Sequence, residues 1–336
     1  MRKSTLLGGA VAAALLLFAA PALAQCGPGA IGTSREVKID AASGPRFGQV
    51  QYHGTDFLQP GEIVLTFDDG PHKQLTPVIL NTLAQHCAKA TFFMLGQRAI
   101  MYSDLVKEVA AHGHTIGTHT WSHANLRRQS AEGAIAEIEL GISGVQKGLG
   151  SPAAPFFRFP YLSDPPNAIA HLKSRNTAIF SIDVDSRDFR TRSPTVVMRN
   201  VMQQLKARGR GIILFHDIQP STAGALGALL TDLKAEGYRV VHLVPAHGQV
   251  TLADFDRRVG TPTRTVSGRS VPVAHRSAVA PMWEPRTVHQ AAGPIAPPPS
   301  AAAQTAQGSA LAAKPADRPA RERDGDDWRK TVFRGY

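Results

Sequence analysis

The sequence predicts an α/β fold, a distorted (β/α) barrel of about seven parallel strands followed by a disordered C-terminal tail. Between about Gly61 and His247, short runs rich in β-branched and aromatic residues alternate with longer helical stretches. Alternation of this kind is typical of a parallel sheet covered by helices. About seven strands fit into fewer than about 200 residues, so a small or distorted barrel fits better than a regular eightfold one.

The individual elements follow from the periodicity of apolar residues. The expected strands cover residues 62–69, 89–96, 114–120, 155–161, 177–184, 211–217 and 239–244. The expected helices cover residues 76–87, 104–113, 195–209 and 226–237, and a further helix follows Ser130, where apolar residues recur at helical period up to Leu149. Glycines stand where these helices are expected to end, at Gly113, Gly150, Gly209 and Gly237.

Residues 1–24 have the layout of a secretory signal peptide. Arg2 and Lys3 precede an uncharged apolar run, and residues 22–24 (Ala-Leu-Ala) supply the small residues of a cleavage site. Pro21 interrupts the run, so it would make a poor spanning helix, and no other stretch of the sequence is apolar enough to cross a bilayer. We therefore expect an exported protein, periplasmic or extracellular, with no stable membrane span after signal cleavage.

An N-terminal extension, residues 25–60, separates the predicted signal peptide from the predicted domain at 61–247. The extension contains Cys26, and Cys87 is the other cysteine of the chain. In an oxidising compartment the two could form a disulfide. The sequence is equally compatible with two unrelated thiols, with Cys87 buried as a small hydrophobic residue.

Residues 248–336 are expected to form a Pro/Ala-rich, basic, disordered tail, because few of them could build a core. Residues 251–336 contain 13 Lys/Arg and 8 Asp/Glu, a net charge of +5 out of +11 for the whole chain. A basic exported protein is attracted to anionic envelope polymers, although the tail could equally serve solubility alone. Export and the lack of a nucleic-acid motif argue against nucleic acid as a partner.

Ionisable residues gather at the ends of the expected strands. They are Asp68-Asp69, His119 to His123, Arg158 with Tyr161, Asp185 with Asp188, and His216-Asp217. Because reactive groups of β/α barrels lie at the carboxyl ends of the strands, and core packing does not explain this distribution, these residues predict an active site.

Asp69, His119 and His123 are the candidate metal ligands. The β-branched, glycine-rich run before the histidines predicts a strand leading into a loop. A set of two histidines and one carboxylate leaves positions open for water and substrate. Asp68 would then be free to take a proton from a bound water, provided that Gly70-Pro71 turns the chain so that both carboxylates face one pocket. We expect a divalent ion, Zn²⁺ first, with Co²⁺, Mn²⁺ or Ni²⁺ as other occupants.

Five motifs, TFDDG, HTWSH, RFPY, DSRDF and LFHD, occur in the order and approximate spacing of the polysaccharide deacetylases, carbohydrate esterase family 4, also called the NodB-homology domain. The resemblance covers roughly residues 61–247. It implies that Asp69, His119 and His123 hold the metal and that Asp68 is the catalytic base, with Arg158 as the arginine that pairs with it.

The resemblance also implies roles for the later motifs. Tyr161 matches the residue whose backbone N–H helps to stabilise the oxyanion, and His216 matches the general acid. Asp185 is assigned as the carboxylate that tunes this histidine. Two positions depart from the usual pattern: Phe189 stands where a tryptophan is common, and Leu162 stands where a glycine is common.

The sequence as a whole indicates an exported metal-dependent hydrolase. It would remove N-acetyl groups from N-acetylglucosamine residues of a polysaccharide, either peptidoglycan or a chitin-type oligomer, and release acetate. One alternative is a non-catalytic glycan- or envelope-binding protein that retains the fold; the filled catalytic positions argue against it. Another is an Fe(II) oxygenase, which the two-His, one-carboxylate set also suits, but Asp68 and His216 would have no role in it.

Overall fold

The computed structural model describes residues 26–54 and 56–260. The predicted signal peptide lies outside the described residues, as does the part of the predicted tail beyond residue 260. Within the described residues, no helix combines the length and the apolar character that crossing a bilayer requires.

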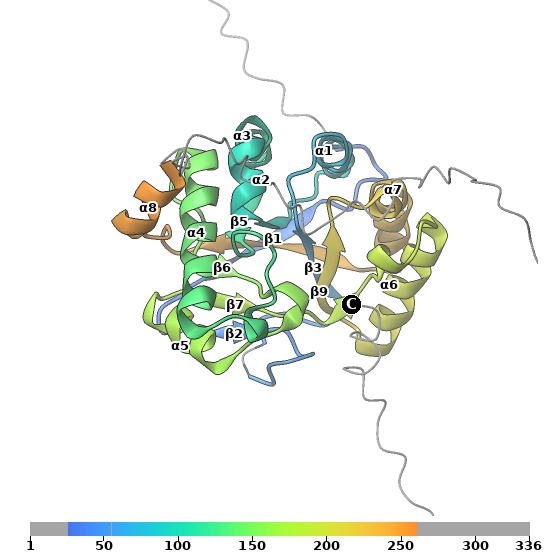
Figure 1. Cartoon of the computed structure of the whole chain (residues 1–336). Coiled ribbons are helices and arrows are strands. Elements are labelled where there is room, and N and C mark those ends of the chain that lie inside the picture. The colour runs from blue at the N-terminus through green and yellow to red at the C-terminus, as the bar shows by residue number, and fades with distance from the viewer. Residues whose placement is uncertain (1–25, 55, 261–336) are drawn as a thin grey trace, which may run out of the picture. The chain divides into compact units, whose positions relative to one another are not determined.

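Parallel strands form the centre of the described unit, and helices lie around them (Figure 1). Strand β3 pairs with β9 on one side and with β4 on the other, and the ladder continues from β4 through β5 and β6 to β7. These strands are β3 (Glu62–Asp68), β4 (Thr91–Met94), β5 (Thr115–Thr118), β6 (Phe156–Phe157), β7 (Ala178–Phe180) and β9 (Gly211–His216).

The segment 178–185 closes the sheet on itself. Its first part is β7, which pairs with β6, and its last part is β8 (Val184–Asp185), which pairs with β9. Because β9 also pairs with β3, the ladder returns to where it began. The predicted distorted β/α barrel is therefore confirmed, and each of the seven predicted strands is present with ends shifted by a few residues.

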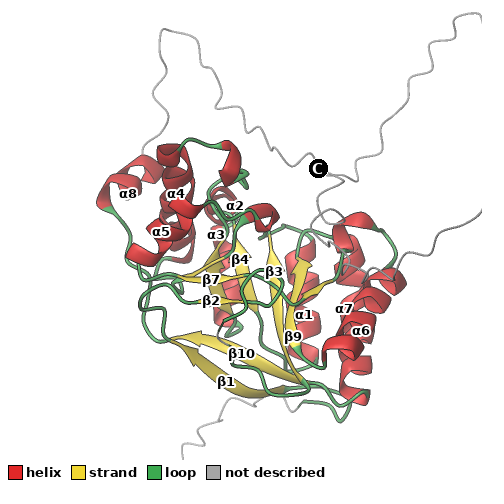
Figure 2. Ribbon diagram, turned by 90° about the horizontal axis from the view of Figure 1, so that it is seen from below, coloured by secondary structure: helices red, strands yellow, loops and turns green. Residues whose placement is uncertain are grey.

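Three further strands were not predicted, among them two that begin in the predicted N-terminal extension. Strand β1 (Thr33–Ile39) pairs with β10 (Arg239–Pro245), and the two lie side by side in Figure 2. Strand β2 (Arg46–Phe47) pairs with β7, and the third is β8. The predicted domain boundary at Gly61 is thus too late, because the extension supplies strands of the same sheet. Strand β1 alternates between half-buried and exposed side chains up to its last residue, and β2 is two residues long, so neither resembles the buried runs of the barrel.

The predicted helices are present and end close to the expected residues, but the last of them begins at Pro220, well before the expected start at residue 226. They are α1 (Leu75–Gln85), α3 (Ser103–Ala111), α4 (Ala131–Leu149), α6 (Pro194–Arg208) and α7 (Pro220–Ala235). The four glycines predicted to end helices have φ between 76° and 82°, the left-handed conformation that glycine adopts without a Cβ penalty. The structure adds α2 (Gly96–Met101), α5 (Pro166–Ser174), α8 (Ala253–Gly260) and the 3₁₀ helices η1 (Leu126–Arg128), η2 (Pro160–Leu162) and η3 (Asp188–Arg190).

Residues 248–260 belong to the folded unit, although the sequence assigned them to the tail. Gln249 is buried and donates its backbone N–H to the carbonyl of Ala153 at 2.8 Å. Helix α8 packs beside α4, where Lys147 Nζ donates to the carbonyl of Val259 at 3.3 Å. The predicted boundary at His247 is therefore too early. A single short amphipathic helix with charges on half of its positions is hard to distinguish from a polar tail by composition.

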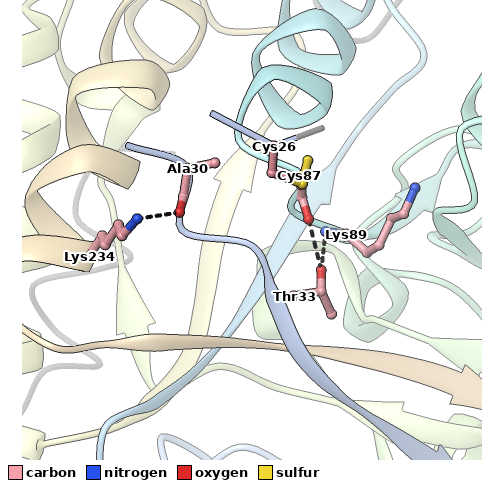
Figure 3. The surroundings of a disulfide bond; sticks show 6 residues. All are labelled: Cys26, Ala30, Thr33, Cys87, Lys89 and Lys234. Atoms are coloured by element: carbon pink, nitrogen blue, oxygen red, sulfur yellow. Dashed lines mark hydrogen bonds between the residues drawn. A yellow bond between two sulfur atoms is a disulfide. The ribbon is translucent and has the colours of Figure 1, made fainter. Parts of the chain in front are cut away.

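A disulfide joins Cys26 to Cys87, whose Cα atoms are 5.8 Å apart (Figure 3). The bond attaches the start of the described chain to the turn after α1. Thr33 also binds the N-terminal segment to this turn, because its hydroxyl accepts from the backbone N–H of Lys89 at 2.8 Å. Lys234 of α7 donates to the carbonyl of Ala30 at 2.7 Å. Of the two states that the sequence left open for the cysteines, the structure has the disulfide.

Candidate active site

Asp69, His119 and His123 converge at the carboxyl ends of β3 and β5. The Oδ1 atom of Asp69 lies 3.4 Å from Nε2 of His119 and 3.2 Å from Nε2 of His123. An ion with four ligands at about 2.1 Å separates neighbouring ligand atoms by about 3.4 Å. Oδ1 of Asp69 is buried and has no hydrogen-bond partner among the described residues. An orphaned carboxylate oxygen at this spacing from two imidazole nitrogens fits a divalent cation.

The two histidines are in the state that metal ligation requires. Burial lowers the pKa of His119 to about 3 and also lowers the pKa of His123, so both rings are neutral near pH 7. Nδ1 of His119 lies 2.7 Å from the carbonyl oxygen of Arg158, and as the N–H donor of this bond it leaves Nε2 with a free lone pair. Second-layer hydrogen bonds of this type orient metal-binding histidines.

The backbone of Asp69 explains how two neighbouring carboxylates reach one pocket. Side chains of successive strand residues point to opposite faces. Asp69 leaves the strand with φ of 75°, and a cis peptide bond follows between Gly70 and Pro71. His123 also has a positive φ, 64°. Left-handed non-glycine residues are uncommon and cluster at functional sites, where surrounding contacts hold them.

Helix α4 holds the loop that carries the histidines. The carboxylate of Glu137 accepts from both the backbone N–H and the hydroxyl of Ser122, each at 2.9 Å. Gly141 allows close approach, because a Cβ atom there would lie 2.5 Å from the carbonyl carbon of Thr120. The Trp121 ring packs against Gly96 of α2 and Gly144 of α4. Trp121 therefore contributes to packing under the histidine loop.

Asp68 forms a buried ion pair with Arg158. Oδ1 of Asp68 lies 2.8 Å from Nη1 of Arg158, whose side chain is fully buried. The same guanidinium donates to the hydroxyl of Thr66 at 2.7 Å and to the carbonyl of Ser181 at 3.1 Å, and it lies over the Phe93 ring. Burial raises the pKa of Asp68 to about 6, and the charge of Arg158 opposes a larger rise. A carboxylate with such a pKa can accept a proton near neutral pH.

His216 lies on the same face of the barrel and pairs with Asp188. Nδ1 of His216 is 2.7 Å from Oδ1 of Asp188, and the backbone N–H of His216 donates to Oδ2 at 2.7 Å. The Thr222 hydroxyl also donates to Oδ2. Burial by itself would lower the pKa of His216, but the carboxylate of Asp188 outweighs it and raises this pKa to about 10. The imidazole is thus protonated near pH 7 and can donate a proton.

The assignment of Asp185 to this role is wrong in the structure. Oδ1 of Asp185 accepts from the backbone N–H of Arg187 at 2.9 Å, and its backbone N–H and carbonyl both bond to the side chain of Gln204. Asp185 therefore braces the turn, while Asp188 occupies the position beside the imidazole. The sequence offered a signal, because both aspartates belong to DSRDF, but spacing alone did not distinguish them.

Tyr161, from the RFPY motif, and Phe189, from the DSRDF motif, each lie beside a histidine of the site. The Tyr161 ring lies 4.6 Å from the His123 ring, edge to face, and the residue has φ of 58°. The Phe189 ring meets the His216 ring edge to face at 5.6 Å. Both departures from the family pattern, Phe189 and Leu162, are thus next to predicted site residues.

Two further acids support the site, the buried Asp217 and the half-buried Glu137 described above. The sequence placed Asp217 among the strand-end residues without giving it a role, and it did not single out Glu137. Asp217 follows His216, its Oδ2 accepts from the Thr76 hydroxyl at 2.6 Å, and burial raises its pKa to about 7. A Cβ atom on Gly70 would lie 2.1 Å from this carboxylate, so Asp217 backs the turn after Asp69. Asp217 was indicated by its place in the LFHD motif at a strand end, whereas nothing in the sequence singles out Glu137 within its helix.

Comparisons with known proteins show which family the chain belongs to. The family model for polysaccharide deacetylase matches residues 58–178. The chain is 35% identical over 190 residues to the peptidoglycan-N-acetylglucosamine deacetylase PgdA of Listeria monocytogenes, covering 56% of this chain and 39% of that protein. It is 33% identical over 168 residues to the chitooligosaccharide deacetylase of Azorhizobium caulinodans, covering 49% of this chain and 77% of that protein.

Among solved structures, the peptidoglycan deacetylase Bd3279 of Bdellovibrio bacteriovorus matches with a TM-score of 0.59 and 34% identity. The match covers 65% of this chain and 60% of that one, so this chain spans less than two thirds of the Bdellovibrio and Listeria proteins. The Bdellovibrio structure shares the fold of this chain, and the sequence match covers most of the Azorhizobium protein. The chain belongs to the polysaccharide deacetylase family, carbohydrate esterase family 4.

Proposed function

We propose that the protein is a metal-dependent hydrolase that removes N-acetyl groups from N-acetylglucosamine residues of a polysaccharide and releases acetate. One observation carries the proposal. Around one cluster of candidate metal ligands the structure has a carboxylate that can accept a proton near neutral pH, Asp68, and a histidine that is protonated there, His216. Asp68 has a pKa raised to about 6 and His216 a pKa raised to about 10, so near pH 7 the first is largely ionised and the second protonated.

Asp69, His119 and His123 would hold the metal, for which we propose Zn²⁺. A divalent ion supplies two kinds of chemistry in such a site, since it lowers the pKa of water and polarises a carbonyl group. Asp68, kept in place by Arg158, takes the proton from the attacking water. The buried ion pair with Arg158 fixes the direction of the carboxylate and favours its charged form.

The departing amine needs a proton, because an amide nitrogen is a poor leaving group otherwise. His216 supplies it from the opposite side, and Asp188 holds the ring by its Nδ1 and keeps it charged. We propose that the backbone N–H of Tyr161 stabilises the oxyanion; one such donor typically contributes about 10²–10³ in rate.

For the substrate we propose peptidoglycan first and chitin-type oligomers second. Relatives with either activity in their names match this chain at similar identity. A predicted signal peptide at residues 1–24 favours export, and an exported enzyme of this kind would meet the cell envelope. The basic residues beyond the described part would then add attraction to anionic envelope polymers.

Acetate release tests the proposal. The zinc-loaded, full-length protein is incubated with N-acetylglucosamine oligomers and with peptidoglycan fragments, and mass spectrometry follows the loss of 42 Da per acetyl group (about the mass of C₂H₂O). Deacetylated products from either substrate support the hydrolase and choose between the polymers. Binding of glycan without product, in a protein that carries a full complement of metal, would instead favour the non-catalytic alternative.

A further inference from the structure

The segment 48–52 contacts the active-site loop although it lies outside the region that the family model matches, residues 58–178. It follows β2, which runs parallel to β7, so it emerges at the carboxyl ends of the strands, on the side of the active site. The segment is close to the barrel from its first residue, because a Cβ atom on Gly48 would lie 2.6 Å from the backbone of Ser181 and Ile182.

The loop 160–164 needs support from outside. Tyr161 and Leu162 have φ of 58° and 51°, two consecutive non-glycine residues in the left-handed conformation. This conformation costs free energy for a residue with a Cβ atom and persists only where surrounding contacts hold it. A glycine at position 162 would adopt this turn without the cost, because it has no Cβ atom.

Val50, Gln51 and Tyr52 each contact the loop, and we call these three residues the N-terminal clamp. Val50 packs against the small apolar cluster of Leu162, Ile182 and Leu214. Nε2 of Gln51 donates to the carbonyl oxygen of Leu162 at 2.8 Å. The Tyr52 hydroxyl donates to Oδ2 of Asp164 at 3.1 Å.

Gln51 also bonds to the strand end that holds Arg158. The Ser181 hydroxyl donates to Oε1 of Gln51 at 2.7 Å, and the Ser181 carbonyl accepts from Nη2 of Arg158 at 3.1 Å. One amide side chain thus connects the arginine that pairs with Asp68 to the residue after Tyr161. Both ends of Gln51 are satisfied, so its position is fixed from two sides.

We propose that the N-terminal clamp is a set of positioning residues, which hold the left-handed turn at Leu162 and so keep Tyr161 against His123. Its effect on turnover rests on the proposed function, because it acts through the proposed role of Tyr161. A clamp of this kind compensates for leucine at a position where glycine would form the turn unaided. The N-terminal segment would then be required for catalysis and not for stability alone.

The test compares full-length, zinc-loaded variants. Gln51→Met keeps the length of the side chain and removes both hydrogen bonds, and Tyr52→Phe removes only the hydroxyl. Gln49→Met is the matched control, since Gln49 is bound through its backbone N–H to Asp183. Hydrogen exchange of the amides in residues 160–164 is measured beside kcat and KM for acetate release.

We expect amide exchange in this loop to rise about tenfold or more in Gln51→Met and less in Tyr52→Phe, with the rest of the chain unchanged. We expect kcat to fall by about 10- to 100-fold with KM within about twofold, because small misplacements of reacting groups act on the chemical step. Gln49→Met should resemble the parent in both measurements.

Unchanged exchange in the loop of both clamp variants would overturn the proposal, whatever their activity. Faster exchange with unchanged kcat, or faster exchange across the whole barrel, would reduce the clamp to ordinary packing and overturn its positioning role. If the parent protein released no acetate, the proposed function would fail, and the exchange data would still decide whether the clamp holds the loop.

Discussion

Nδ1 of His216 lies 2.7 Å from Oδ1 of Asp188, whereas Asp185 bonds to the backbone of its own turn. The carboxylate of Asp188 raises the pKa of His216 to about 10 against the effect of burial. The identity of this partner determines which substitution changes the pH dependence of the reaction.

We expect Asp188→Asn to move the alkaline limb of the pH–rate profile to lower pH. Without the carboxylate, the pKa of His216 falls toward or below its ordinary value, so the imidazole loses its proton at lower pH. Asp185→Asn is the matched variant and should leave this limb in place while lowering the rate at every pH. A shift in Asp185→Asn but not in Asp188→Asn would contradict the assignment.

The two neighbouring aspartates should differ in metal content. Asp69→Asn and His119→Ala are expected to lose the metal, since Asp69 supplies the orphaned oxygen that faces both histidines. Asp68→Asn should keep the metal and lose about 10²–10⁴ in turnover, the usual contribution of general base catalysis. Elemental analysis of the purified variants measures the metal content, and acetate release measures turnover. If only Asp68→Asn lacked the metal, Asp68 would be the ligand and Asp69 the base.

Removing Arg158 should affect both stability and pH dependence. Arg158→Met leaves Asp68 buried without its partner, and breaking a buried pair costs about 3–5 kcal/mol. The pKa of Asp68, already raised by burial, should rise further, so the acid limb of the rate profile moves to higher pH. Chemical denaturation measures the first effect. Arg187→Met, which removes a half-exposed arginine 4.0 Å from Asp185, should change stability by less than about 1 kcal/mol.

The disulfide should contribute to stability and not to turnover. It joins two cysteines with a sequence separation of 61, and a disulfide typically stabilises the folded protein by roughly 2–4 kcal/mol. Cys87 precedes β4, so the bond lies at the amino ends of the strands, away from the active site. We expect Cys26→Ser with Cys87→Ser to lower the melting temperature and to leave kcat at 25 °C within about twofold. A large loss of kcat in a variant that is still folded at that temperature would contradict this location.

Helix α8, at the end of the described residues, predicts where the chain can be shortened. A chain that ends at residue 260 should melt like the full-length protein. One that ends at Gly248 loses α8 and the buried Gln249, and its melting temperature should fall by several degrees, since about 1 kcal/mol corresponds to roughly 2–4 °C at this size. Equal melting temperatures of the two shortened chains would show that α8 adds nothing to stability.

The shortened chains also test the role of the basic residues beyond position 260. Weaker binding of these chains to insoluble cell wall, together with salt-sensitive binding of the full-length protein, would support electrostatic tethering.

Much of the barrel could be predicted because its signals are local. Most of the buried strands are rich in apolar residues, and each of the four glycines predicted to end a helix has the left-handed conformation. The cluster of candidate metal ligands could be predicted for a similar reason. Asp69 and His119 directly follow strands, His123 lies in the loop after the second of these strands, and parallel strands bring their carboxyl ends to one edge.

The sequence did not reveal the parts that depend on long-range contacts. Strands β1 and β2 exist because distant strands offer them a free edge, and their own residues carry a weak signal. Helix α8 is held by α4, and Gln51 finds its partners in Ser181 and Leu162. These contacts join residues separated by more than 100 positions, so no local pattern encodes them.

The choice between Asp185 and Asp188 shows the same division within one motif. The sequence by itself placed DSRDF at the end of a predicted strand, on the active-site edge, and the family resemblance carried by its motifs implied that an acid from DSRDF would stand near His216. Which acid faces the imidazole was decided by the turn between them, where Arg187 has φ of 53° and η3 begins at Asp188. The hydroxyl groups of Ser221 and Thr222, from α7, then hold Asp188 in place. Residue types determined the chemistry available at this edge, and tertiary packing decided which atoms meet, because side-chain direction depends on backbone conformations that neighbours far along the chain stabilise.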